Sequence, residues 1–208
     1  MTPIDEGYIK YQIHWQPTAT PASFCNEVAV LNYWRTEMYL RNWIGYDSKL
    51  KVGFGNISMR TPSKSGRFLI SGTQTGHLSE LTLQNYALVK DYNIAANELW
   101  CEGSTKASSE SLTHAAIYEL NDDYQSVIHI HCKEMWLQLL HKVPTISANI
   151  PYGTPEMAFE IQRLHLETDL AQTKIVAMAG HENGLIAFGK DLKQAANVFY
   201  CNATILTP

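Results

Sequence analysis

The sequence lacks the features of an exported, membrane-spanning or nucleic-acid-binding protein. It contains no run of about 18 apolar residues, and its N-terminus has no basic segment followed by an apolar one, so neither a membrane helix nor a secretion signal is expected. An excess of positive charge is also absent, since the formal net charge is −4, and this disfavours nucleic acid as a partner. We therefore expect a cytoplasmic protein whose partners are small molecules or other proteins.

Cysteine is scarce and widely spaced. The four cysteines, at positions 25, 101, 132 and 201, form no Cys-x-x-Cys pair. This spacing favours reduced thiols over a disulfide framework or a zinc site built from thiolates. We expect the cysteines to be free and structural.

The 208 residues contain no internal repeat, low-complexity tract or flexible linker, which predicts a single domain over 1–208. After an irregular N-terminal segment, the spacing of apolar residues predicts helices and strands in alternation. The helices are expected at 23–40, 108–121, 133–142, 154–170 and 191–204, and the strands at 53–60, 66–73, 86–95, 98–103, 125–131, 173–180 and 184–189. Because the strands come in hairpin-like pairs as well as singly, we expect a layered α/β fold with a mostly antiparallel or mixed central sheet and helices on both faces.

One predicted strand contains two histidines separated by a single apolar residue. Side chains alternate along a strand, so His129 and His131 share one face with Val127, while Ile128 and Ile130 face the other way. Two imidazoles in this arrangement can bind one zinc ion, with each nitrogen about 2.0 Å from the metal. A His-x-His pair is also compatible with ordinary core or solvent-facing histidines, and taken alone it leaves both interpretations open.

Three further polar residues are candidates for the same site. Glu110 and His114 are four residues apart and therefore lie on one face of a predicted helix, and His181 lies between two predicted strands. Each has a simpler interpretation. A carboxylate in a first helical turn stabilises the helix dipole by about 0.3–1 kcal/mol, and a histidine between strands can be an ordinary turn residue.

Five short segments between about residues 28 and 200 carry a resemblance to a known family. The segments "GNISMR", "FLISGTQTGHLSELT" and "KASSESLTHAAIYEL" are similar to a Gly-Asn-x-Ser-x-Arg segment, an Ile-Thr-Pro-Thr/Ser-Gly loop and a Pro-Ser-Ser-Glu helix start. The segments "SVIHIH" and "GHENGLIAFGKDLKQA" are similar to a Val-Val-His-x-His strand and a His-Gly-Leu segment with its following helix. Each is weak evidence alone, but in this order and spacing they resemble the class II aldolase/adducin family.

The resemblance implies a metal-dependent enzyme that acts on a small sugar or sugar phosphate. It implies that Zn2+, or another divalent metal, is bound by His129, His131 and His181. Glu110 would be the acid/base, whereas His114 would pack or hydrogen-bond beneath its helix. The residues implied for binding a substrate phosphate are Gly55, Asn56, Thr73, Ser108 and Ser109. The metal would polarise a ketose carbonyl and stabilise the enediolate that forms when the C–C bond breaks. A homotetramer is also implied.

Four departures from the family pattern make the reaction less certain than the metal. Glu182 and Asn183 intervene before the glycine that usually follows the third histidine, so Glu182 is a further candidate near the metal. Gly53 and Gln74 replace a phosphate-binding hydroxyl residue and a glycine. The position of a family tyrosine is taken by an alanine, with a tyrosine four residues later, and the sequence ends soon after the last predicted helix. We therefore keep two alternatives to an aldolase-type lyase: a metal-dependent sugar-phosphate epimerase or dehydratase, and a non-catalytic adducin-like binding domain.

Overall fold

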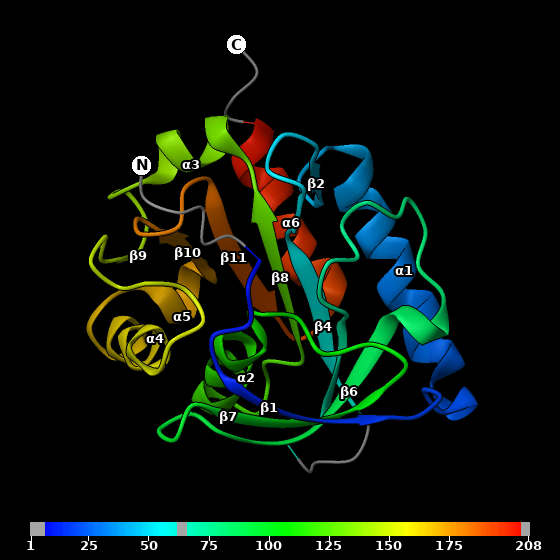
Figure 1. Cartoon of the computed structure of the whole chain (residues 1–208). Helices are drawn as coiled ribbons and strands as arrows, with labels where there is room; N and C mark the ends of the chain where they lie inside the picture. The colour runs from blue at the N-terminus through cyan, green and yellow to red at the C-terminus, as the bar shows by residue number, and fades with distance from the viewer. Residues whose placement is uncertain (1–6, 62–65, 205–208) are drawn as a thin grey trace.

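The computed structural model of the protein describes residues 7–61 and 66–204 and has a nine-stranded sheet at its centre (Figure 1). The strand order is β1-β7-β6-β5-β4-β8-β11-β10-β9. These strands are β1 (Gln12–Pro17), β4 (Asn56–Arg60), β5 (Phe68–Ser71), β6 (Tyr86–Asn93), β7 (Glu98–Gly103), β8 (Ser126–His131), β9 (Thr145–Ile146), β10 (Ile175–Met178) and β11 (Gly184–Gly189). Two short strands, β2 (Gly45–Asp47) and β3 (Val52–Phe54), form a separate antiparallel hairpin.

The central sheet is mixed, as predicted. The pairings β7–β6–β5–β4–β8–β11–β10 are antiparallel, whereas the two outermost strands, β1 and β9, pair in parallel with their neighbours. The strands expected to pair at 173–180 and 184–189 form the antiparallel pair β10–β11, and β4–β5 and β6–β7 are also antiparallel pairs. The mostly antiparallel or mixed sheet of the predicted α/β class is thus confirmed.

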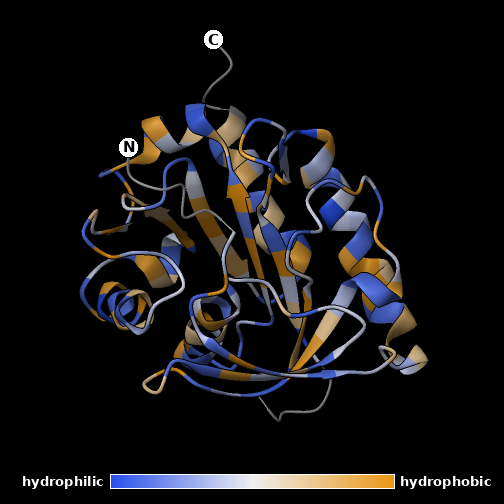
Figure 2. Ribbon diagram, in the orientation of Figure 1, coloured by the Kyte–Doolittle hydropathy of each residue, from blue (hydrophilic) through white to orange (hydrophobic). Residues whose placement is uncertain are grey.

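Helices cover both faces of the sheet and create two apolar cores. The helices are α1 (Cys25–Leu40), α2 (Ser111–Leu120), α3 (Lys133–Leu139), α4 (Pro155–Glu167), α5 (Leu170–Thr173) and α6 (Leu192–Thr204), with short 3-10 turns at Ala22–Phe24 and Leu83–Asn85. One core contains α2 and α4, and the other contains α1, α3 and α6. Figure 2 shows hydrophobic colour along the central strands that lie between these layers. Within the described residues, no helix is both long and apolar enough to cross a bilayer.

Strand β8 connects the two cores because its side chains alternate between them. Val127 belongs to the core beside α2 and α4, whereas Ile128 and Ile130 belong to the core beside α1 and α6. The predicted alternation along this strand is therefore confirmed. Its central position between β4 and β11 places His129 opposite Asn56 on one neighbour and Ile186 on the other.

Three sequence-based predictions of local structure need correction. Part of the segment expected to be irregular, Gln12–Pro17, forms β1, whose Ile13 and Trp15 pack on the α2/α4 core. The strand predicted at 53–60 is interrupted at Gly55, whose φ is +73° and whose added Cβ would lie 3.0 Å from the His129 carbonyl oxygen. The helix predicted from residue 108 or 109 begins at Ser111, after a turn in which the Ser111 amide donates to the Ser108 carbonyl.

Candidate metal centre and its cavity

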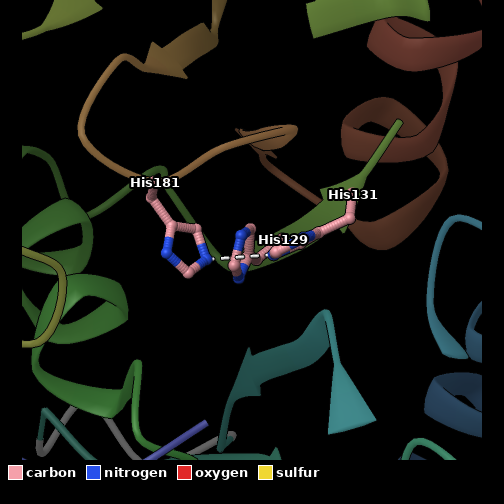
Figure 3. A group of neighbouring side chains, drawn as sticks. All are labelled: His129, His131 and His181. Atoms are coloured by element: carbon pink, nitrogen blue, oxygen red, sulfur yellow. Dashed lines mark hydrogen bonds between the residues drawn. The ribbon is translucent and has the colours of Figure 1, made fainter. Parts of the chain in front are cut away.

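Three histidines from two parts of the chain converge at one end of the sheet. His129 and His131 lie at the end of β8, and His181 lies in the turn between β10 and β11. Their potential ligand nitrogens all lie within 4.8 Å of one another, and Figure 3 shows the three rings side by side. The His131 and His181 Nε2 atoms are 3.0 Å apart, close to the roughly 3.3 Å expected for two nitrogens bound to one tetrahedral zinc. The structure therefore brings together the three predicted ligands.

The electrostatics of these rings suit a metal ligand. Burial lowers the pKa of His131 to about 4, and burial together with the neighbouring histidines holds the pKa of His129 well below its usual value. The pKa of His181 is also well below its usual value, because of burial and the nearby His131 and Lys10. All three imidazoles are therefore neutral at pH 7, and neutral imidazole is the form that binds a metal.

Asn56 on β4 positions the ring of His129. The Asn56 side-chain nitrogen lies 3.4 Å from His129 Nδ1. On the other side of the ring, His129 Nε2 is buried and has no hydrogen-bond partner, and the same is true of Asn56 Oδ1. A buried nitrogen without a partner beside two further imidazoles is an observation that a bound cation would explain, so the residues present fit a divalent metal.

Glu110 lies beside this cluster at the N-cap of α2 and is 2% exposed. Its side chain makes no capping hydrogen bond, so a helix-cap role does not account for its position. Burial raises the pKa of Glu110 to about 7; Thr113 and Lys10 oppose this effect, although no hydrogen bond to either carboxylate oxygen meets ordinary geometry. A buried carboxyl group with a pKa near 7 can both accept and donate a proton at neutral pH.

The residues predicted to bind phosphate line one small cavity together with Glu110, His129 and His181. They are Gly55, Asn56, Thr73, Ser108 and Ser109. The cavity has a volume of about 20 Å³ and is also lined by Gly7, Gln74 and Tyr152. Phe54 separates it from a second cavity of about 280 Å³, which is lined by residues that include His131 and Lys133.

His114 lies outside the histidine cluster, although it is close enough to help lower the pKa of His129. Its Nδ1 is 2.7 Å from the Ser58 hydroxyl, which is also 2.7 Å from the Tyr118 hydroxyl. His114 is fully buried. The expectation that it hydrogen-bonds beneath its helix agrees with this geometry.

Two residues that the sequence left undecided have clear positions. Tyr152 lines the small cavity, and its ring centroid lies 4.7 Å from that of His181. Its hydroxyl accepts a hydrogen bond from the Tyr8 amide, and Lys10 Nζ lies 3.8 Å from its ring centroid. Glu182 is exposed and lines the larger cavity, but it is outside the histidine cluster found among the described residues.

The N-terminal contribution to the site was not predicted from the sequence. Gly7 lines the small cavity and Tyr8 contacts Tyr152, 144 residues along the chain. Contacts between residues so far apart in the sequence cannot be recognised from the local spacing of residue types. Only the presence of tyrosine four residues after Ala148 gave a hint of one partner.

Residues 38–206 match the family described as class II aldolase and adducin N-terminal domain. The chain belongs to this family. None of the curated proteins matches the sequence significantly. Among solved structures, l-fuculose-1-phosphate aldolase from Thermus thermophilus is 20% identical with a TM-score of 0.60, over 86% of this chain and 91% of that one. A sugar-phosphate aldolase from Thermotoga maritima is 15% identical with a TM-score of 0.62, over 89% and 97% of the two chains.

A third similar structure is YgbL from Escherichia coli, whose description leaves aldolase, epimerase and decarboxylase activities open. It is 20% identical with a TM-score of 0.63, over 88% of this chain and 87% of that one. These structures share the class II aldolase fold with the present chain. At such identities they establish the fold and not the reaction.

Proposed function

We propose that this protein is a zinc-dependent aldehyde-lyase of the aldolase type, which cleaves or forms a C–C bond in a small sugar or sugar phosphate. The observation that carries the proposal is the convergence of three neutral imidazoles, two buried and one half-buried, beside a buried carboxyl group that has no hydrogen-bond partner. Purely structural packing gives no reason to gather these four polar groups, because each loses hydration there.

His129, His131 and His181 would hold the ion. Three protein ligands leave one position open, which is the arrangement of catalytic zinc. When bound, zinc would polarise the substrate carbonyl and stabilise the enediolate produced by C–C cleavage.

Glu110 would transfer the proton. It lines the same cavity as His129, where it would face the substrate carbon that gains or loses a proton. Its pKa of about 7 matches the range in which a carboxyl group serves as both acid and base. Tyr152 lines the same cavity, and its hydroxyl is held by the backbone of Tyr8.

A metal-dependent epimerase or dehydratase is the second candidate. Ala148, which takes the position of the family tyrosine, is exposed and is not among the residues that line the cavity. A different placement of the proton donor would redirect the same enediolate chemistry toward epimerisation or loss of water. A non-catalytic adducin-like role is disfavoured by the buried, unpaired carboxyl group of Glu110.

The test combines metal analysis with a substrate panel. Purified protein should contain about one divalent metal ion per chain, and mass spectrometry of reactions with small ketoses and ketose phosphates should show products of C–C cleavage. Glu110→Gln should retain the metal and lose turnover, whereas Glu80→Gln, which changes an exposed acid, should retain both. Absence of metal would refute the proposal, and products of unchanged mass or of water loss would favour the second candidate.

The homotetramer implied by the resemblance is part of the same proposal. Light scattering should give four times the 23.5 kDa mass of one chain. A monomeric mass would refute this part alone.

A further inference from the structure

Gln74 lies at the mouth of the small cavity in a backbone conformation that favours glycine. Its φ is +59°, a region that residues with a Cβ rarely adopt. Its side-chain oxygen accepts a hydrogen bond of 3.1 Å from the Gly53 amide, and its side-chain nitrogen donates one of 3.1 Å to the Gly7 carbonyl. Gln74 is exposed and lines the cavity, so these bonds join Gly7 to Gly53 on the solvent side of the cavity.

The cavity behind Gln74 is too small for a phosphate group. Its volume of about 20 Å³ corresponds to roughly one or two water molecules, because one water needs about 10–15 Å³ by the same measure. A phosphate has five heavy atoms. The volume does not hold a phosphate while Gln74 keeps its hydrogen bonds to Gly53 and Gly7.

Three of the backbone amides that line this cavity already have hydrogen-bond partners. The Gly53 amide donates to Gln74, the Gly72 amide to the Asn85 carbonyl at 2.8 Å, and the Thr73 amide to the Lys106 carbonyl at 3.0 Å. An anion binds a loop through amides that point at it and lack another partner. These three amides therefore offer little to a phosphate.

The charge around the cavity leads to the same conclusion. Among the described residues that line it, none is lysine or arginine, and Glu110 is an acid. Lys10 contributes a positive charge nearby, with its amine over the Tyr152 ring, but it does not line the cavity. Phosphate sites usually include a cationic side chain.

Space for a substrate lies on the other side of Phe54. The second cavity has a volume of about 280 Å³ and reaches His131, so it adjoins the metal ligands. Lys133 and Glu182 line it and offer a donor and an acceptor to a polar chain. This volume is close to the lower limit of about 300 Å³ for small-molecule pockets.

We infer that Gln74 is a specificity-determining residue that excludes phosphate, and that the substrate is a small, unphosphorylated hydroxycarbonyl compound. This inference rests on the proposed function, since it names the substrate class of the same site. The hydroxyl and carbonyl oxygens of the compound meet the histidine cluster, and its carbon chain extends past Phe54 toward Lys133. Gln74 acts by closing the mouth and occupying the Gly53 amide.

The test measures binding of inorganic phosphate to the zinc-loaded protein by calorimetry at constant ionic strength. Gln74→Gly removes the side chain and suits the positive φ, so we expect phosphate to bind about ten-fold more tightly than to the wild type, the effect of regaining about one hydrogen bond to a charged group. Gln74→Asn, which also tolerates a positive φ but is one methylene shorter, provides a second variant and should show a smaller gain.

Asn42→Gly is the matched control. Asn42 is exposed, uncharged and has a φ of +56°, so its replacement relieves the same backbone conformation away from the cavity. If phosphate binds to the metal itself, that binding raises the measured phosphate affinity of this control and of Gln74→Gly by the same amount. Equal phosphate affinity in wild type and Gln74→Gly, with both folded, would overturn the inference.

Metal content measured on the same samples separates this inference from the proposed function. A wild-type protein that binds no metal would refute the function, and the same phosphate titration of the metal-free wild type and Gln74→Gly would then decide whether Gln74 excludes phosphate. A protein that binds metal but gains no phosphate affinity on loss of Gln74 would refute the inference and leave the function standing.

Discussion

Replacement of Asn56 tests whether His129 is prepared to bind a metal through Nε2. For Nε2 to offer its lone pair, Nδ1 must carry the proton and donate it to an acceptor. A half-turn of the Asn56 amide exchanges its oxygen and nitrogen without a change of shape. It would bring Oδ1, which has no partner, to the proton on Nδ1. Asn56→Ala removes that acceptor.

The expected effect is a loss of zinc affinity by about ten-fold. Loss of a partner that orients a metal-binding histidine weakens binding by roughly 10–100-fold. The separation of 3.4 Å between Asn56 and His129 is longer than the usual 2.9–3.0 Å, so we expect the lower end of this range. Ten-fold corresponds to about 1.4 kcal/mol.

Competition with a chromophoric zinc chelator measures this affinity without any assay of turnover. Asn56→Asp keeps an acceptor oxygen and should bind zinc at least as tightly as the wild type. Asn149→Ala, at an exposed position, should not change the affinity. Equal affinity in wild type and Asn56→Ala would show that Asn56 does not orient the ring, and the reasoning would fail.

Three further changes probe the site and its support. His131→Ala removes one of three ligands and should abolish stoichiometric zinc in elemental analysis, whereas His165→Ala on α4 should not. Because burial raises the folded pKa of Glu110 from 4.5 to about 7, the metal-free wild type should lose stability relative to Glu110→Gln as pH rises through this window, which urea unfolding measures. Ser58→Ala leaves the buried His114 nitrogen and a tyrosine hydroxyl unpaired and should lower the free energy of unfolding by about 1–3 kcal/mol.

The parts of the site that could be predicted from the sequence depend on local spacing. The alternation of side chains along β8 placed His129 and His131 on one face. This prediction needs only the sequence of the strand itself. The order of the family segments added Glu110 and His181. The helix start near Glu110 was misplaced because serines at 108, 109 and 111 are all plausible first-turn or capping residues, so the composition does not fix the boundary.

The parts that could not be predicted depend on contacts between distant segments. Strand β1 pairs in parallel with β7, and paired residues are about 86 positions apart in the sequence. Neither strand's local sequence indicates which strand it will pair with. Gln74 was noted from the sequence only as a replacement for glycine. Its two hydrogen bonds, to Gly53 and Gly7, join three segments that approach one another only in the folded chain. Side-chain hydrogen bonds of this kind are set by tertiary geometry and not by residue type.

The candidate metal ligands lie on two neighbouring parts of the sheet, and this makes metal binding a measure of how that half of the sheet folds. His129, His131 and His181 meet only after the last hairpin, β10–β11, has closed and β11 has paired with β8. Contacts this far apart in sequence form late, because the entropy of closing long loops must be overcome first. Zinc should therefore bind tightly only after these strands have paired, and stopped-flow metal uptake should follow this folding phase rather than the appearance of helices.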